Sequence, residues 1–370
     1  MDLEKTNKIS RNSVFELLRV FSIFLIIFSH YSIHGIGELD YSTFGFNSIF
    51  FSCVRLGDIG TTLFMLISGF FLVNSSGVKL QKILKLLFEL FFYLIVSYVI
   101  SLSLKIQTFS FESFIKVFLG FFYGKNWFIC CYILLYLLHP FINKMLVTIT
   151  KKEIGIFIII LLFLWFLVPT FLFAPNQFSN LLSLFNIYCI GAFIRIAFDK
   201  NYYNKLFSVK YSLISLAVCL TVMFSSTVIF CFFASKDIVG SNIVTHFIER
   251  NSIFVLFTCI SIFVLALHAK PFKSRLVNIV SSTSLGIYLI HDNESMRGYY
   301  WNNLFKVKDY LSSNLCILHF FVTCLIIFLG CCIIDLIRQY CVELPIFKLP
   351  FLKERTLYSV NSNDENQKTL

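Results

Sequence analysis

Long runs of apolar residues alternate with short polar loops along almost the whole chain. A helix needs about 20 apolar residues to cross a bilayer, and ten runs reach or approach that length. An eleventh run, 111–122, is too short to cross and predicts an interfacial or re-entrant piece. The pattern therefore predicts an all-α polytopic bundle of about ten transmembrane helices. They are expected over 13–34, 47–73, 80–104, 127–147, 154–173, 181–198, 209–234, 252–268, 277–293 and 314–338.

The even spread of these runs predicts one transmembrane domain over residues 13–340, with a cytoplasmic segment, 1–12, before it and a cytoplasmic tail, 341–370, after it. The first run carries Arg19 and has no small-residue cleavage site, so it predicts a retained helix and not a signal peptide. From about Leu352 the tail is polar, and we expect it to lack a fixed structure.

Composition supports a membrane solvent: 58% of the residues are hydrophobic and only 14% are charged, against about 25% charged in soluble domains. The formal net charge of +11 would suggest nucleic acid for a soluble protein. Here, however, 21 of the 31 Lys and Arg residues fall in one set of alternate loops and 9 in the other. This asymmetry predicts that both ends are cytoplasmic, and no nucleic-acid partner is expected.

The twelve cysteines lie mostly inside apolar runs. A disulfide framework would need them in exposed loops, and no Cys/His spacing here is typical of a metal site. We therefore expect packing residues and no metal. The abundance of Phe, Ile, Asn and Lys is typical of an AT-rich bacterial genome, which favours a bacterial plasma membrane.

Two ionisable residues share one face of the first predicted helix. Eleven residues separate Arg19 from His30, which at about 100° per residue is three turns plus about 20° and places them about 16 Å apart along the axis. Ionisable groups inside a membrane are costly and point to function. The face could hold an anionic ligand at its inner end, Arg19, and a proton-transfer group at its outer end, His30. The simpler alternative is an interfacial Arg and an interfacial His.

Two neighbours modify this face. Glu16 precedes Arg19 by one turn and is expected to pair with it. His34 lies one turn beyond His30, but a metal site needs a third ligand and the sequence offers none nearby.

Small and basic residues follow in the next two spans. Ser68 and Gly69 lie deep in an apolar helix, where close helix packing is the simplest explanation, above all for Gly69. Lys82 and Lys85 lie on one side of the start of the third span, at the cytoplasmic surface. They suit a phosphate-bearing ligand, although a purely topological signal would explain them too. His291, at the outer end of the ninth span, is too close in sequence to Asp292 to pair with it, but it could meet His30 across the bundle.

Six motifs in order resemble the acyltransferase-3 family of integral-membrane O-acyltransferases, over about residues 11–350. At one of them the family has a basic Arg-x-x-Arg motif, and this chain departs from it by having Lys at both basic positions, Lys82 and Lys85. The motifs are Arg19 and His30 eleven positions apart, LFMLISGFF, Lys82-x-x-Lys85, the Trp127–Phe128 pair, SLGIYLIH ending at His291, and Glu343-Leu-Pro.

The resemblance implies acyl transfer, usually acetyl, from cytoplasmic acyl-coenzyme A to a hydroxyl of a glycan at the outer face, with no bound cofactor. His30 would act as general base, since His titrates near neutral pH, and Arg19 would complete the catalytic face. Lys82, Lys85 and Ser68 would bind the donor. On the acceptor side we expect His291, Glu16 and Trp127.

Two other functions remain open. A polar-lined bundle would also serve a transporter or flippase of glycans or acyl groups. A non-catalytic membrane partner in glycan assembly would tolerate substitution of both Arg19 and His30.

Overall fold

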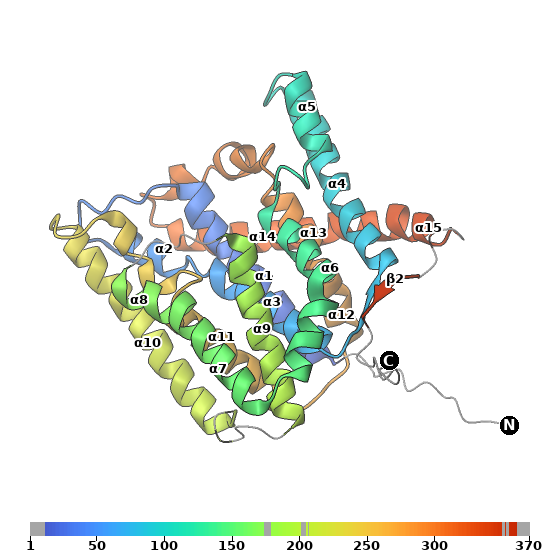
Figure 1. The fold of residues 1–370 in the computed structure, drawn as a ribbon. Coiled ribbons are helices and arrows are strands. Elements are labelled where there is room, and N and C mark those ends of the chain that lie inside the picture. Colours follow the sequence, from blue (N-terminus) through green and yellow to red (C-terminus); the bar gives the residue numbers. More distant parts are fainter. Residues whose placement is uncertain are drawn as a thin grey trace, which may run out of the picture.

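The computed structural model describes residues 12–173, 179–200, 205, 207–349, 352 and 355–360. These residues form an all-α bundle and one two-stranded ribbon (Figure 1). The longer helices are α1 (Ser13–His30), α3 (Gly57–Leu72), α4 (Leu80–Ser103), α6 (Trp127–Thr148), α7 (Lys151–Leu162), α9 (Asn180–Asp199), α10 (Val209–Ala234), α11 (Ile253–His268) and α14 (Cys316–Arg338). The shorter ones are α2 (Phe46–Cys53), α5 (Phe111–Phe118), α8 (Val168–Leu172), α12 (Arg275–Ser282), α13 (Ser284–His291) and α15 (Leu344–Phe347).

Within the described residues, nine helical runs are long and apolar enough to cross a membrane. They match nine of the ten predicted spans. One face of α14 shows why lipid must surround the bundle, because its side chains are between 45% and 60% exposed. That face consists of Leu318, Phe321, Val322, Leu325, Ile326, Leu329, Ile333, Ile334 and Ile337.

The tenth predicted span, 277–293, is not one helix. It is divided at Thr283 into α12 and α13, of eight residues each. Hydroxyl side chains at the break compete with the helix for its own carbonyls: Ser282 Oγ donates to the Ile279 oxygen at 2.7 Å, and Thr283 Oγ1 donates to the Val280 oxygen at 2.7 Å. The predicted span 47–73 is likewise interrupted, at 54–56, between α2 and α3.

Helices α1, α3 and α9 form the centre of the bundle, and glycine sets their spacing. A Cβ at Gly69 would lie 2.2 Å from the carbonyl oxygen of Tyr188, and one at Gly191 would lie 2.5 Å from that of Leu66. The backbones of α3 and α9 therefore touch, as small residues permit in membrane bundles. The packing role predicted for Gly69 is confirmed.

Both ends of the described chain lie at one end of the bundle. Phe15, in the first turn of α1, packs on Phe70 near the end of α3, with ring centroids 6.3 Å apart. Just after α3, strand β1 (Gly77–Lys79) pairs with β2 (Thr356–Ser359) in antiparallel register. The expectation that the tail lacks structure from Leu352 is therefore wrong for residues 356–359. Most of segment 1–12 and residues 361–370 lie outside the described residues.

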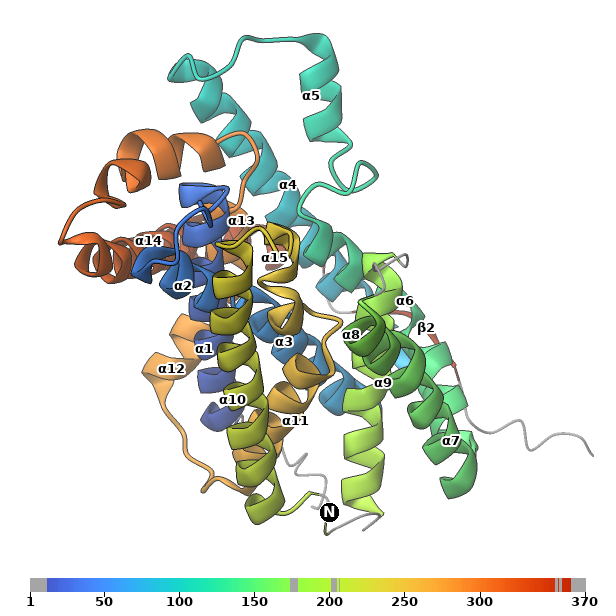
Figure 2. The same ribbon diagram turned by 90° about the vertical axis from the view of Figure 1, so that its left-hand side faces the viewer.

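The short apolar run 111–122 contains α5, which lies beside the C-terminal end of α4 and outside the bundle (Figures 1 and 2). Phe111, Phe118 and Phe122 are 70%, 61% and 80% exposed. This position agrees with an interfacial piece and not with a re-entrant one. All twelve cysteines are free, and nine of them are buried, as expected of packing residues.

Candidate active site

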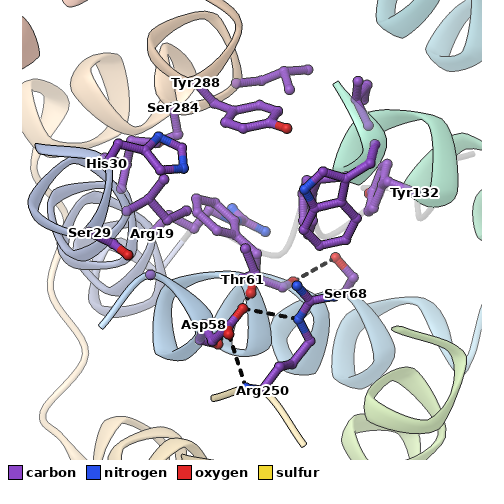
Figure 3. Close-up of a pocket in the computed structure, with 18 of the residues that line it drawn as sticks. Arg19, Ser29, His30, Asp58, Thr61, Ser68, Tyr132, Arg250, Ser284 and Tyr288 are labelled. Atoms are coloured by element: carbon purple, nitrogen blue, oxygen red, sulfur yellow. Dashed lines mark hydrogen bonds and ion pairs between the residues drawn. The ribbon is translucent and has the colours of Figure 1, made fainter. Parts of the chain in front are cut away.

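A cavity of about 740 Å³ extends along one face of α1. Its walls come from α1, α3, α4, α6, α12, α13 and the segment before α11 (Figure 3). Arg19, Ile23, Ile26 and His30 line it from α1, and Ile33 lines it from the helical turn Tyr31–Ile36 that follows. The predicted common face of Arg19 and His30 is therefore present, and it is the face that borders the cavity.

Helix α3 runs antiparallel to α1, which gives the cavity two distinct ends. A Cβ on Gly57 would lie 2.9 Å from Ser29, next to His30, whereas Phe70 packs against Phe15. Asp58 consequently belongs to the end of the cavity near His30, and Ser68 to the end near Arg19.

At the His30 end, a chain of hydrogen bonds fixes the histidine tautomer. His291 Nδ1 lies 2.5 Å from the carbonyl oxygen of Ile287, so this nitrogen must carry the proton. The neutral His291 ring then offers Nε2 as an acceptor, and His30 Nδ1 lies 2.9 Å from it. His30 must donate through Nδ1, which leaves its Nε2 with a free lone pair, as a general base requires. The predicted meeting of His291 with His30 is thus observed, and His291 itself is 2% exposed.

A second group of polar side chains adjoins His30. His34 Nε2 lies 3.4 Å from Asp292 Oδ1, and His30 Nδ1 lies 3.9 Å from the same oxygen. Ligand atoms of these three residues lie within 4.8 Å of one another, so Asp292 supplies the third potential metal ligand that the sequence did not reveal. However, Arg297 Nη1 donates to Asp292 Oδ1 at 3.0 Å, and His30 Nδ1 already faces His291. Two of the candidate ligand atoms, Asp292 Oδ1 and His30 Nδ1, therefore already have partners in the protein.

At the opposite end, Arg19 is held by Glu16. Arg19 Nη1 donates to Glu16 Oε1 at 2.8 Å, and Ser281 Oγ donates to the other carboxylate oxygen at 2.5 Å. The predicted Glu16–Arg19 pair is confirmed. Glu16 lies beside Arg19, about four turns of α1 from His30, so a role on the acceptor side would place the acceptor near Arg19.

Lys82 and Ser68 line the cavity near Arg19, as the donor-binding prediction requires. The Lys82 ammonium sits over the Tyr136 ring, 4.2 Å from its centroid. Among the described residues no carboxylate lies within ion-pair distance of Lys82, so its charge is available to a ligand.

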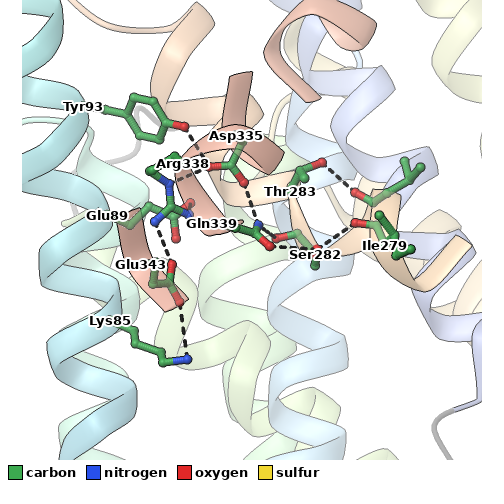
Figure 4. A network of polar contacts seen from close by, with 11 residues as sticks. Lys85, Glu89, Tyr93, Ile279, Ser282, Thr283, Asp335, Arg338, Gln339 and Glu343 are labelled. Atoms are coloured by element: carbon green, nitrogen blue, oxygen red, sulfur yellow. Dashed lines mark hydrogen bonds and ion pairs between the residues drawn. The ribbon is translucent and has the colours of Figure 1, made fainter. Parts of the chain in front are cut away.

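Lys85 is directed elsewhere. Its ammonium lies 3.3 Å from Glu343 Oε1, at the edge of a buried network around Arg338 (Figure 4). Arg338, 3% exposed, contacts three carboxylates: Asp335 at 2.8 Å, Glu343 at 2.7 Å and Glu89 at 3.1 Å. Lys85 therefore belongs to a structural network and does not line the cavity.

The end near His30 also contains charged residues that the sequence reading missed. Arg250 donates to both Asp58 oxygens, from its backbone N at 3.0 Å and from Nε at 3.1 Å, and its guanidinium lies 4.2 Å from the Trp127 ring centroid (Figure 3). Arg55 lines the same end. Arg55 and Asp58 fall inside the predicted span 47–73, so the rule that flagged Arg19 would also have found them.

Comparison with known proteins now identifies the family. A family model described as an acyltransferase domain, that of acyltransferase family 3, matches residues 12–336, nearly the whole chain. The chain belongs to the acyltransferase-3 family. No match was found among curated proteins or among solved structures. The match shows a multi-pass membrane acyltransferase, and the cavity that contains Arg19 and His30 is its candidate active site.

Proposed function

We propose that this acyltransferase-3 protein moves an acyl group, represented by acetyl, from cytoplasmic acyl-coenzyme A to a hydroxyl of a cell-surface or exported polysaccharide. It would act in a bacterial plasma membrane, with acetyl-CoA as co-substrate and with no resident cofactor. One observation carries the proposal: Lys82, which has no carboxylate partner among the described residues, lines the same cavity as His30, a histidine held in its basic tautomer.

The donor would enter at the Arg19 end. Coenzyme A carries several phosphate charges, and Lys82 offers them an ammonium without a carboxylate partner. Arg19 and the Ser68 hydroxyl face the same space. The thioester would extend from there along the α1 face toward His30, over about 16 Å.

Chemistry would take place beside His30. Its Nε2 removes the proton of the acceptor hydroxyl, and the oxygen attacks the thioester carbonyl carbon. The tetrahedral intermediate collapses with cleavage of the carbon–sulfur bond. The proton held by His30 then passes to the leaving thiolate, which gives free coenzyme A and the O-acyl ester. His291 keeps the ring oriented throughout, through its contact with Nδ1.

The test uses full-length protein in lipid nanodiscs with radiolabelled acetyl-CoA and the host's surface glycan. We expect labelled glycan with the wild type and at least a 10²-fold lower rate with His30→Ala, since a general base contributes about 10²- to 10⁴-fold. His268→Ala is the matched control, because this histidine at the end of α11 is hydrogen-bonded to the Phe207 carbonyl at 2.8 Å, packs on Phe198 and lies outside the cavity lining.

Unchanged acylation by His30→Ala would reject the mechanism. Movement of an intact solute across the membrane without loss of the thioester would instead favour the transporter. Tolerance of substitution at both Arg19 and His30 would favour a non-catalytic partner.

A further inference from the structure

Four Lys and Arg side chains line the cavity, and they differ in how their charge is balanced. Arg19 is paired with Glu16 and Arg250 with Asp58. Within the described part of the chain, Arg55 and Lys82 have no carboxylate at ion-pair distance. One lies at each end of the cavity, and the Lys82 end is the one that suits the phosphates of the donor.

Arg55 is fixed in place by neutral groups. Its Nε donates to Ser32 Oγ at 3.0 Å, and its Nη2 donates to the carbonyl oxygen of Gly37 at 3.0 Å. Ser32 Oγ in turn donates to the Phe51 carbonyl at 2.8 Å. Neutral acceptors orient a guanidinium without cancelling its charge. Of its five N–H groups, three remain for a ligand.

Arg55 lies at the end of the cavity that contains His30, where the acceptor hydroxyl would react. Its anchor Ser32 follows His30 by two residues, about 3 Å along the helix axis, and Arg55 lines the cavity together with His30 and Ile33. Glu249 also lines this end, but it lies beyond ion-pair distance of Arg55 and accepts from Thr245 Oγ1 at 3.4 Å. Burying a cation without a counter-charge inside a membrane helix bundle costs free energy, and an anionic ligand would offset that cost.

We propose that Arg55 binds an anionic group, a carboxylate or a phosphate, on the acceptor glycan, so that the acceptor is an acidic polysaccharide. This inference rests on the proposed function and narrows its substrate class. The proposed function places the donor phosphates near Lys82, at the other end of the cavity, which leaves Arg55 for an anion on the acceptor. Guanidinium groups favour such anions because they can bind two oxygens at once.

The experiment compares two probes on full-length protein in nanodiscs: a tetramer of galacturonic acid and the same tetramer with its carboxyl groups reduced to give galactose. Equilibrium binding, acetyl transfer from acetyl-CoA, and acetyl-CoA hydrolysis without acceptor are measured separately. A glycan phosphodiester of equal length serves as a second anionic probe and separates carboxylate from phosphate. The variants are Arg55→Gln, Arg55→Lys and the control Arg195→Gln, whose native side chain pairs with Asp199 on α9 outside the cavity lining.

We expect the wild type and Arg195→Gln to bind an anionic probe about 10- to 100-fold more tightly than the neutral one, as one charge-assisted contact implies. Arg55→Gln should weaken binding of the anionic probe, leave binding of the neutral probe unchanged, and so abolish the preference. The rate of acetyl-CoA hydrolysis without acceptor should not change. Arg55→Lys should retain part of it, which guards against misfolding as the explanation.

Several results would overturn the inference. The wild type could bind all probes equally or bind none of them. Arg55→Gln could lose the same affinity for anionic and neutral probes. It could also lose acetyl-CoA hydrolysis, which would assign Arg55 to stabilising the oxyanion of the reaction. A preference for anionic probes without any acyl transfer would support the anion site and reject the proposed function.

Discussion

At the scale of single residues, the tautomer of His30 depends on its neighbour. Because the Ile287 carbonyl holds the proton on His291 Nδ1, His291 Nε2 can only accept from His30. We expect His291→Ala to lower the rate of acyl transfer at least about 10-fold, since His30 can then adopt the tautomer that lacks a basic Nε2. His291→Gln should recover most of the rate, because its amide can donate to Ile287 and accept from His30. Turnover at fixed protein and lipid content measures both variants, and a fully active His291→Ala would contradict the relay.

Arg338 forms ion pairs with three carboxylates. Arg338→Leu should lower the free energy of unfolding by about 3–5 kcal/mol, since the carboxylates would remain buried without their partner. Lys85→Met should cost less than about 1 kcal/mol, as Lys85 is 38% exposed and contributes one outer contact. Denaturant unfolding in detergent compares the two, and equal losses would show that the network is not what stabilises this region.

At the scale of elements, the contact between α3 and α9 depends on two glycines that admit no Cβ. Gly69→Ala should destabilise the protein by about 1–3 kcal/mol, the usual cost of overpacking. Gly330→Ala on α14 is the matched control, because a Cβ there meets nothing within 4 Å; alanine's higher helix propensity should leave it neutral or up to about 1 kcal/mol more stable. Thermal unfolding of both variants in nanodiscs is the measurement, and identical behaviour would contradict the close approach.

At the scale of the whole molecule, the start of α1 and strand β2 lie at the same end of the bundle, through the Phe15–Phe70 contact and the β1–β2 pairing, and the charge asymmetry predicts the same side for both. We predict that this side is cytoplasmic. An epitope inserted after Gln107, between α4 and α5, should bind antibody on intact cells. The same epitope after Leu370 should bind only after permeabilisation. Detection of both epitopes on intact cells would contradict the topology.

The apolar pattern by itself determined the membrane class, nine of the spans and the face shared by Arg19 and His30. It could do so because crossing a bilayer imposes a length on each helix, and helical periodicity fixes which side chains share a face. It also predicted the Glu16–Arg19 pair, since that contact is local.

Only the tertiary structure decided which distant residues meet. The break at Thr283 arises from hydroxyl contacts that compete with a helix, and hydropathy does not register them. The strand at 356–359 exists because it finds a partner at 77–79. Lys82 and Lys85 look equivalent in sequence, yet one faces the cavity and the other Glu343. Likewise, the sequence could not predict that Arg55 has no carboxylate partner among the described residues. That depends on which cations the nearby carboxylates pair with in the folded chain, as Asp58 pairs with Arg250.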